Sequence, residues 1–197
     1  MKKLTDERYE EIKKAAADLL EKANIHKIPI DPLQIATAEG IKLIPYSYFP
    51  QKKRTLLLLA SEDGFCCRDG LQEIIYFNDE GRCYERIRQT IMHEIGHIVL
   101  EHAGGIFDEV PLDVQEQEEA EARFFAKYIL CPPPLLQLYD IHDFYDIYTL
   151  FHVSMEAAQY AMNYYQKWQL YAGCLREYER KMLRLFPANQ RKKENYE

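Results

Sequence analysis

The sequence is poor in the cysteine patterns that stabilise small secreted proteins. It has five cysteines, an odd number, and none of them forms a C-x-x-C pair, while Cys66 and Cys67 are adjacent. A disulfide framework or a cysteine-based zinc site is therefore not expected. Reduced thiols are typical of the cytoplasm, which is the location that this pattern favours.

Long apolar runs and an excess of positive charge are also missing. Residues 1–20 are charged throughout and lack the apolar stretch of a signal peptide. The most hydrophobic run, RTLLLLASE, is far too short to span a bilayer. The net charge of -7 and the pI near 5.5 disfavour binding to phosphate backbones. We therefore expect no membrane segment and no direct binding of nucleic acid.

What the chain does contain is the composition of an ordinary globular protein. Its 197 residues are 47% hydrophobic and 29% charged, which is enough to bury one core. No internal repeat or low-complexity linker divides it. This length predicts one domain, with room for a small appendage.

Most of the chain has helical periodicity. The first helix is expected at residues 5–24, with Thr5 as its cap, and a short one at residues 32–39, between the cap Asp31 and Gly40. A third runs over residues 85–102 and stops at the glycine pair 104–105. Later helical segments are expected at residues 115–130, 143–151, 154–168 and 174–186, followed by a polar, frayed end.

Strand signals fall between the second and third helices. Residues 41–49, 55–60, 64–70 and 71–78 are short, apolar and separated by turn residues. Two or three of them are expected to pair as an antiparallel meander, with residues 71–78 as its last strand. The fold class is therefore α+β, mostly helical, with a small antiparallel sheet before the helix at residues 85–102.

That helix carries the motif H-E-x-x-H at residues 93–97. Residues four apart lie on one face of a helix, so His93 and His97 can both reach one zinc ion. Glu94 lies beside such an ion, where it can act as a general base. Zinc lowers the pKa of water to about 7, so hydroxide becomes available at neutral pH. The pattern predicts a zinc-dependent hydrolase, although a solvated helix face without metal can show the same residues.

A catalytic zinc needs a third protein ligand and an open position. The glutamate-rich helix that follows offers four candidates: Glu116, Glu118, Glu119 and Glu121. Its buried stripe is expected at Ala122, Phe125, Ala126 and Ile129, which leaves Glu116 farther away than the other three. The spacing alone does not choose among Glu118, Glu119 and Glu121.

Three segments in this order resemble the ImmA/IrrE family of HExxH metallopeptidases: RIRQTIMHEIGHIVLEH, EEAEARFFAKYILCP and FHVSMEAAQYAM. The stretch PIDPLQIATAEGIKLIPY is similar to the beginning of the same family. The resemblance covers about residues 5–168 and implies a zincin-like peptidase domain over residues 1–168, with a C-terminal helix and polar tail over residues 169–197. Family members are usually cytosolic, and they are linked to cleavage of helix-turn-helix repressors.

The resemblance also implies roles for individual residues. His93 and His97 match the first two zinc ligands, Glu94 the general base, and Glu119 the third ligand, with Glu121 as the second choice. Arg123 departs from the pattern, because an Asn or Asp commonly stands there. Either the surroundings of the ligand are rebuilt or the alignment is shifted by a turn. The implied function is transcription regulation by zinc-dependent cleavage of a repressor.

Other functions and residues stay open at this point. The protein could instead bind a repressor without cutting it and use zinc structurally or as a sensor. Residues 151–162 echo a DNA-binding helix-turn-helix, but the segment lacks the basic residues that such readers need. His102 is expected to be a surface or C-terminal-turn histidine, with polarisation of a substrate carbonyl as the alternative. Residues 71–78 are a possible edge strand for an extended substrate. For the last helix, core packing is expected, with a dimer or docking contact as the alternative.

Overall fold

The computed structural model describes residues 3–102, 111–171 and 174–186. Its helices and strands, in chain order, are α1 (Asp6–Lys22), α2 (Pro32–Ala38), β1 (Lys42–Pro45), the 3-10 turn η1 (Tyr46–Tyr48), α3 (Gln51–Ala60), β2 (Gly64–Asp69), β3 (Gln72–Phe77), α4 (Tyr84–Val99), α5 (Leu112–Leu130), α6 (Pro133–Leu138), α7 (Phe144–Phe151), α8 (Met155–Tyr171) and α9 (Glu177–Leu185). The α+β class and the predominance of helix are confirmed.

Capping residues set the helix starts that the sequence predicted. The Thr5 hydroxyl accepts the backbone N–H of Arg8 at 3.2 Å, and Asp31 accepts that of Leu33 at 3.0 Å. Gly40 follows α2 with a positive φ of 69°, as expected of a residue just past a helix end. The predicted glycine stop at 104–105 and the polar tail beyond residue 186 lie outside the described residues.

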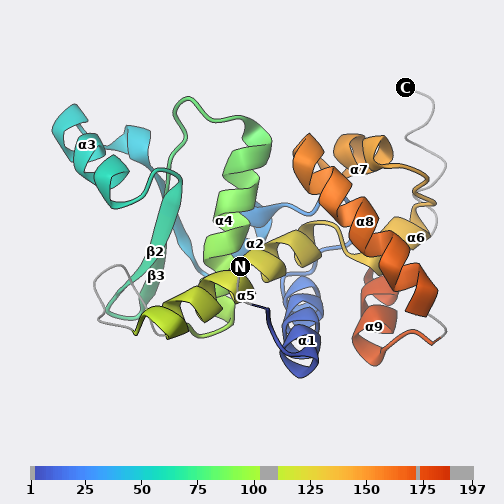
Figure 1. Cartoon of the computed structure of the whole chain (residues 1–197). Coiled ribbons are helices and arrows are strands. Elements are labelled where there is room, and N and C mark those ends of the chain that lie inside the picture. Colours follow the sequence, from blue (N-terminus) through green and yellow to red (C-terminus); the bar gives the residue numbers. More distant parts are fainter. Residues whose placement is uncertain (1–2, 103–110, 172–173, 187–197) are drawn as a thin grey trace.

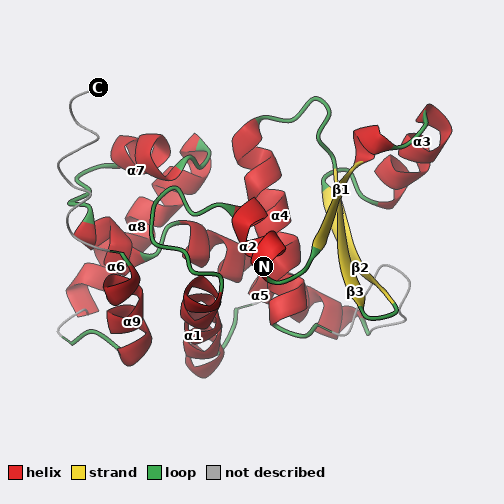
Figure 2. Ribbon diagram, turned by 180° about the vertical axis from the view of Figure 1, so that it is seen from behind, coloured by secondary structure: helices red, strands yellow, loops and turns green. Residues whose placement is uncertain are grey.

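The described residues form one three-stranded sheet in the order β1-β3-β2. The predicted antiparallel pair is present as the β2–β3 hairpin, with Cys66 opposite Ile75. In contrast, β1 joins β3 in parallel, so the sheet is mixed. The prediction that residues 71–78 form an edge strand was wrong, because β3 lies between the other two strands (Figure 2). The edge strand on the side of the hairpin is β2.

The run TLLLLA at residues 55–60 is helical in α3, so its prediction as a strand was wrong. Leucine is a strong helix former, and this run contains one β-branched residue, Thr55. None of the α3 side chains is buried. The helix lies at the outer end of the sheet, away from the other helices (Figure 1).

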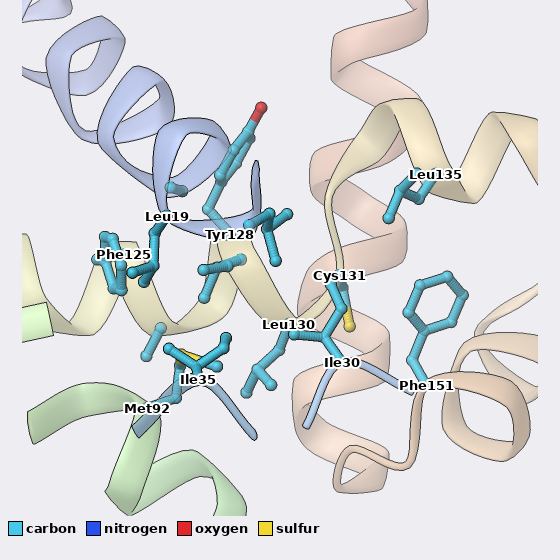
Figure 3. Close-up of a cluster of buried hydrophobic side chains, with 14 of the residues drawn as sticks. Leu19, Ile30, Ile35, Met92, Phe125, Tyr128, Leu130, Cys131, Leu135 and Phe151 are labelled. Atoms are coloured by element: carbon cyan, nitrogen blue, oxygen red, sulfur yellow. The ribbon is translucent and has the colours of Figure 1, made fainter. Parts of the chain in front are cut away.

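The core lies where α1, α2, α4, α5 and α6 meet. Figure 3 shows Leu19, Met92, Phe125 and Leu130 from three of these helices converging in one cluster. The side chain of Arg88 is also buried, and it donates hydrogen bonds to the carbonyls of Ile30, Phe151 and His152. Helix α4 is therefore fixed from its buried side, while its other face remains available for chemistry.

Candidate metal centre

Helix α4 presents His93 and His97 on one face, as their four-residue spacing requires. Their Nε2 atoms lie 3.2 Å apart. Helix α5 crosses α4 closely (Figure 1), and its residue Glu119 contacts both imidazoles. Two imidazole nitrogens so close together, with a second helix directly opposite, create a place where a third donor can complete a metal site.

Glu119 supplies that third donor. Its Oε2 lies 3.4 Å from Nε2 of His93, and its Oε1 lies 3.4 Å from Nε2 of His97. All three donor atoms lie within 4.8 Å of one another. Hydrogen bonds from His93 and His97 hold the pKa of Glu119 well below its usual range. Burial opposes the charge on His97, but the hydrogen bond to Glu119 raises the pKa of this imidazole.

The donor set fits a zinc ion. Two imidazole nitrogens and a carboxylate oxygen that converge on one point are a ligand set typical of catalytic zinc. The convergence of the three groups is a geometry that one bound cation would satisfy.

Gly96 explains how α5 comes so close. A Cβ atom at this position would lie 3.0 Å from Cδ1 of Phe125 and 3.3 Å from Cα of Ala122. Ala122 therefore packs against the bare backbone of α4. Glu119, one turn earlier on α5, is then placed opposite the histidine pair.

The other three glutamates do not join this cluster. Among the described residues, the convergent group contains neither Glu116 nor Glu118. Glu121 is only 2% exposed and faces a different set of partners: Arg8 Nη2 at 2.6 Å, His102 Nε2 at 3.0 Å and Gln117 Nε2 at 3.0 Å. Burial opposes its ionisation, but these hydrogen bonds, led by the one from Arg8, lower the pKa of Glu121 to about 2.

Glu94 lies beside the cluster and is 7% exposed. Its Oε2 accepts a hydrogen bond of 2.9 Å from the backbone N–H of Cys66 in β2. Burial and then the charge of Glu94 raise the pKa of the Cys66 thiol, and the same two causes raise the pKa of Tyr46 to about 12. Both neighbours of Glu94 therefore remain protonated at neutral pH.

His102 was expected to be a surface or C-terminal-turn histidine. It does follow the end of α4, but its side chain is only 4% exposed. Its Nδ1 lies 2.9 Å from Nδ1 of His97, and its Nε2 faces Glu121. Glu101, with a φ of 55°, turns the chain back after α4 and places His102 there. The left-handed backbone at a glutamate has no reliable sequence signal, so the sequence did not predict this contact.

The remaining histidines stay apart from the cluster. The imidazole of His142 is exposed and lies 3.7 Å from Asp140, and His26 is also exposed. His152 forms the left-handed end of α7. None of these three belongs to the convergent group found among the described residues.

A cleft of about 990 Å³ opens over His93, Glu94 and Glu119. One wall comes from the start of α8, including Met155 and Tyr160. The opposite wall comes from the start of β2 and from residues 81–83. Four basic residues also line the cleft: Arg82, Arg86, Arg123 and Lys127. Helix α8 also packs Ala158, Ala161 and Tyr165 into the core. The segment that echoes a helix-turn-helix therefore belongs to the core and to one wall of this cleft.

Arg123 occupies the position where the resemblance implied an Asn or Asp. Its Nη2 lies 3.6 Å from Oε2 of Glu119, one turn back on α5. It thus contacts the carboxylate and lies in the cleft. The contact with His97 is made by His102 instead.

Comparison with known families confirms the resemblance. A family model of the IrrE N-terminal-like domain matches residues 43–163, which is more than half of the chain. No curated protein gives a match. Within the described ranges, no helix combines the length and the apolar character needed to cross a bilayer. The matched segment contains α4, α5 and the cleft between them, and the chain belongs to the IrrE N-terminal-like family of metallopeptidases, peptidase family M78.

Proposed function

We propose that this protein is a zinc-dependent endopeptidase of the cytoplasm that cleaves a helix-turn-helix transcriptional repressor. The observation that supports the chemistry best is the convergence of His93, His97 and Glu119 beside the buried carboxylate of Glu94. The substrate class rests on the family. We also propose that residues 1–168 form the peptidase domain, with a C-terminal helix and tail over residues 169–197.

His93, His97 and Glu119 are the proposed ligands. A zinc ion held by them would act as a Lewis acid that makes water acidic and polarises the scissile carbonyl. The open cleft over His93, Glu94 and Glu119 leaves room for a peptide and a water molecule. The side chain of Arg123 beside Glu119 balances part of the negative charge at the floor of the cleft.

Glu94 is the proposed general base. It would take a proton from the water whose oxygen attacks the carbonyl carbon, and give that proton to the amine nitrogen as the C–N bond breaks. The Cys66 amide holds one carboxylate oxygen, so the other oxygen is available to face the water. Proton transfer of this kind typically contributes about 10²–10⁴-fold to the rate.

The decisive experiment compares Glu94→Gln with the parent in cells that co-express a candidate repressor from the same source. We expect the variant to bind one equivalent of zinc and to leave the repressor intact, because glutamine cannot accept the proton. Exposed Glu116, on α5 and outside the cluster, offers the control Glu116→Gln, which should cut like the parent. If Glu94→Gln relieves repression as fully as the parent does, the protein acts by binding and the peptidase proposal fails.

The ligand assignment has its own test. Glu119→Ala should lose zinc during dialysis, since it removes one of three protein ligands, whereas Glu116→Ala should retain it. Zinc content per polypeptide, measured by atomic emission, gives the answer directly. A fully loaded Glu119→Ala variant would exclude Glu119 as the third ligand.

A further inference from the structure

We infer that Arg8, Glu121 and His102 are positioning residues that orient His97 and fix its tautomer, so that its Nε2 lone pair faces the metal. The inference rests on the proposed metal site and extends it to three residues outside the donor set. The chain of contacts runs from α1 through α5 to the end of α4, and it begins with a residue outside the segment 43–163 that the family model matches.

The direction of these hydrogen bonds follows from Glu121. An ionised carboxylate can only accept, so the Nε2 of His102 at 3.0 Å must carry the proton of that contact. A neutral imidazole has one N–H, which leaves a lone pair on Nδ1 of His102. The Nδ1 of His97, 2.9 Å away, must then be the donor. With this arrangement, the Nε2 of His97 would present its lone pair to a bound zinc ion, which would replace the proton that this nitrogen otherwise shares with Glu119.

Burial shields the contacts on both sides of His102 from solvent. The side chains of His102 and Glu121 are 4% and 3% exposed. Both nitrogens of His102 are thereby engaged, one by each neighbour.

Arg8 holds the far end of the chain of contacts. Its Nη2 donates to Oε2 of Glu121 at 2.6 Å, and Gln117 donates to Oε1 of the same carboxylate. A buried carboxylate needs such a partner, because an unpaired charge in this position would protonate or move. The guanidinium of Arg8 also contacts Glu11, but that glutamate is exposed and does not reach His102.

The test measures zinc affinity by competition with a chromophoric chelator, at neutral pH and with zinc as the only ligand. His102→Leu should weaken binding about 10–100-fold, the usual effect of losing a partner of a metal-bound histidine. His102→Gln should retain most of the affinity, because its amide can accept from His97 and donate to Glu121. Arg8→Ala should weaken binding about tenfold. Glu11→Gln removes the other partner of Arg8 and should bind zinc like the parent.

A second measurement uses the parent protein alone, so a folding defect in a variant cannot affect it. Nitrogen-15 NMR of the zinc-loaded parent, with labelled histidine, should show protonated Nδ1 on His97 and protonated Nε2 on His102. A proton on Nδ1 of His102, or an unchanged zinc affinity in folded His102→Leu, would overturn the inference. If Glu94→Gln still cleaves the repressor, only the peptidase proposal is refuted, because this substitution changes neither the zinc affinity nor the tautomer of His97. If the parent protein binds no zinc, the peptidase proposal and the present inference are both refuted.

Discussion

The backbone N–H of Cys66 donates a hydrogen bond of 2.9 Å to Oε2 of Glu94. This contact joins the edge strand β2 to the helix that carries the HExxH motif. The small sheet therefore does more than cover one side of α4, because it holds the carboxylate of the proposed general base.

Cys66→Pro tests this contact, because proline lacks the N–H. One hydrogen bond to a charged group contributes about 1.5–3 kcal/mol, so we expect kcat to fall roughly 10–100-fold, with zinc content unchanged. Cys66→Ala keeps the amide and is the matched control, with an expected kcat within about threefold of the parent. Equal rates for the two variants would show that the Cys66 amide does not hold the base.

Gly96→Ala should loosen the contact between α4 and α5. The added methyl group would lie 3.0 Å from Phe125 and 3.3 Å from the backbone of Ala122, closer than side chains normally pack. We expect a loss of about 1–3 kcal/mol in the free energy of unfolding, and weaker zinc binding as Glu119 moves away. Urea unfolding with and without zinc measures both effects, and Lys14→Ala at an exposed site of α1 is the control.

Arg88→Lys should destabilise the protein although the charge is kept. The guanidinium donates to three carbonyls, those of Ile30, Phe151 and His152, in a geometry that a single ammonium cannot reproduce. The expected loss is about 2–4 kcal/mol. Two residues earlier, the exposed Arg86 pairs with Asp63 at the surface, and Arg86→Lys should change stability by less than about 1 kcal/mol. Similar melting temperatures for the two variants would contradict this difference.

Acid should destabilise the protein through Glu121. Its pKa falls from the usual 4.5 to about 2 in the folded state, so the folded state favours its ionised form. The stability that this carboxylate contributes is complete above pH 4.5 and is lost as the pH falls toward 2. The free energy of unfolding should decline by up to about 3 kcal/mol more in the parent than in Glu121→Gln over this interval. Exposed Glu116→Gln should follow the parent curve, and parallel curves for all three proteins would exclude the effect.

Local signals in the sequence were sufficient for much of the fold. Thr5 and Asp31 carry side chains that cap helices in any context, and the apolar spacing of α4 and α5 requires a buried stripe. The motif at residues 93–97 placed three site residues by helix geometry alone. Glu119 required the resemblance as well, because residue spacing did not separate it from Glu118 and Glu121.

The errors arose where distant contacts or weak local signals decide the structure. A run of four leucines suits a strand or a helix, and α3 became helical without burying a single side chain. Parallel pairing of β1 with β3 depends on a connection through α3 that no local pattern predicts. His102 reaches His97 because Glu101 adopts a left-handed conformation, which its residue type does not favour.

The anchoring of Arg88 has a consequence for synthesis of the chain. Two of its three carbonyl partners, Phe151 and His152, follow the HExxH motif by more than fifty residues. A ribosome-bound chain that has exposed α4 and α5 still lacks these acceptors, so its arginine cannot yet be buried in the native way. The cleft should therefore be completed late in translation, when the start of α8 is also available.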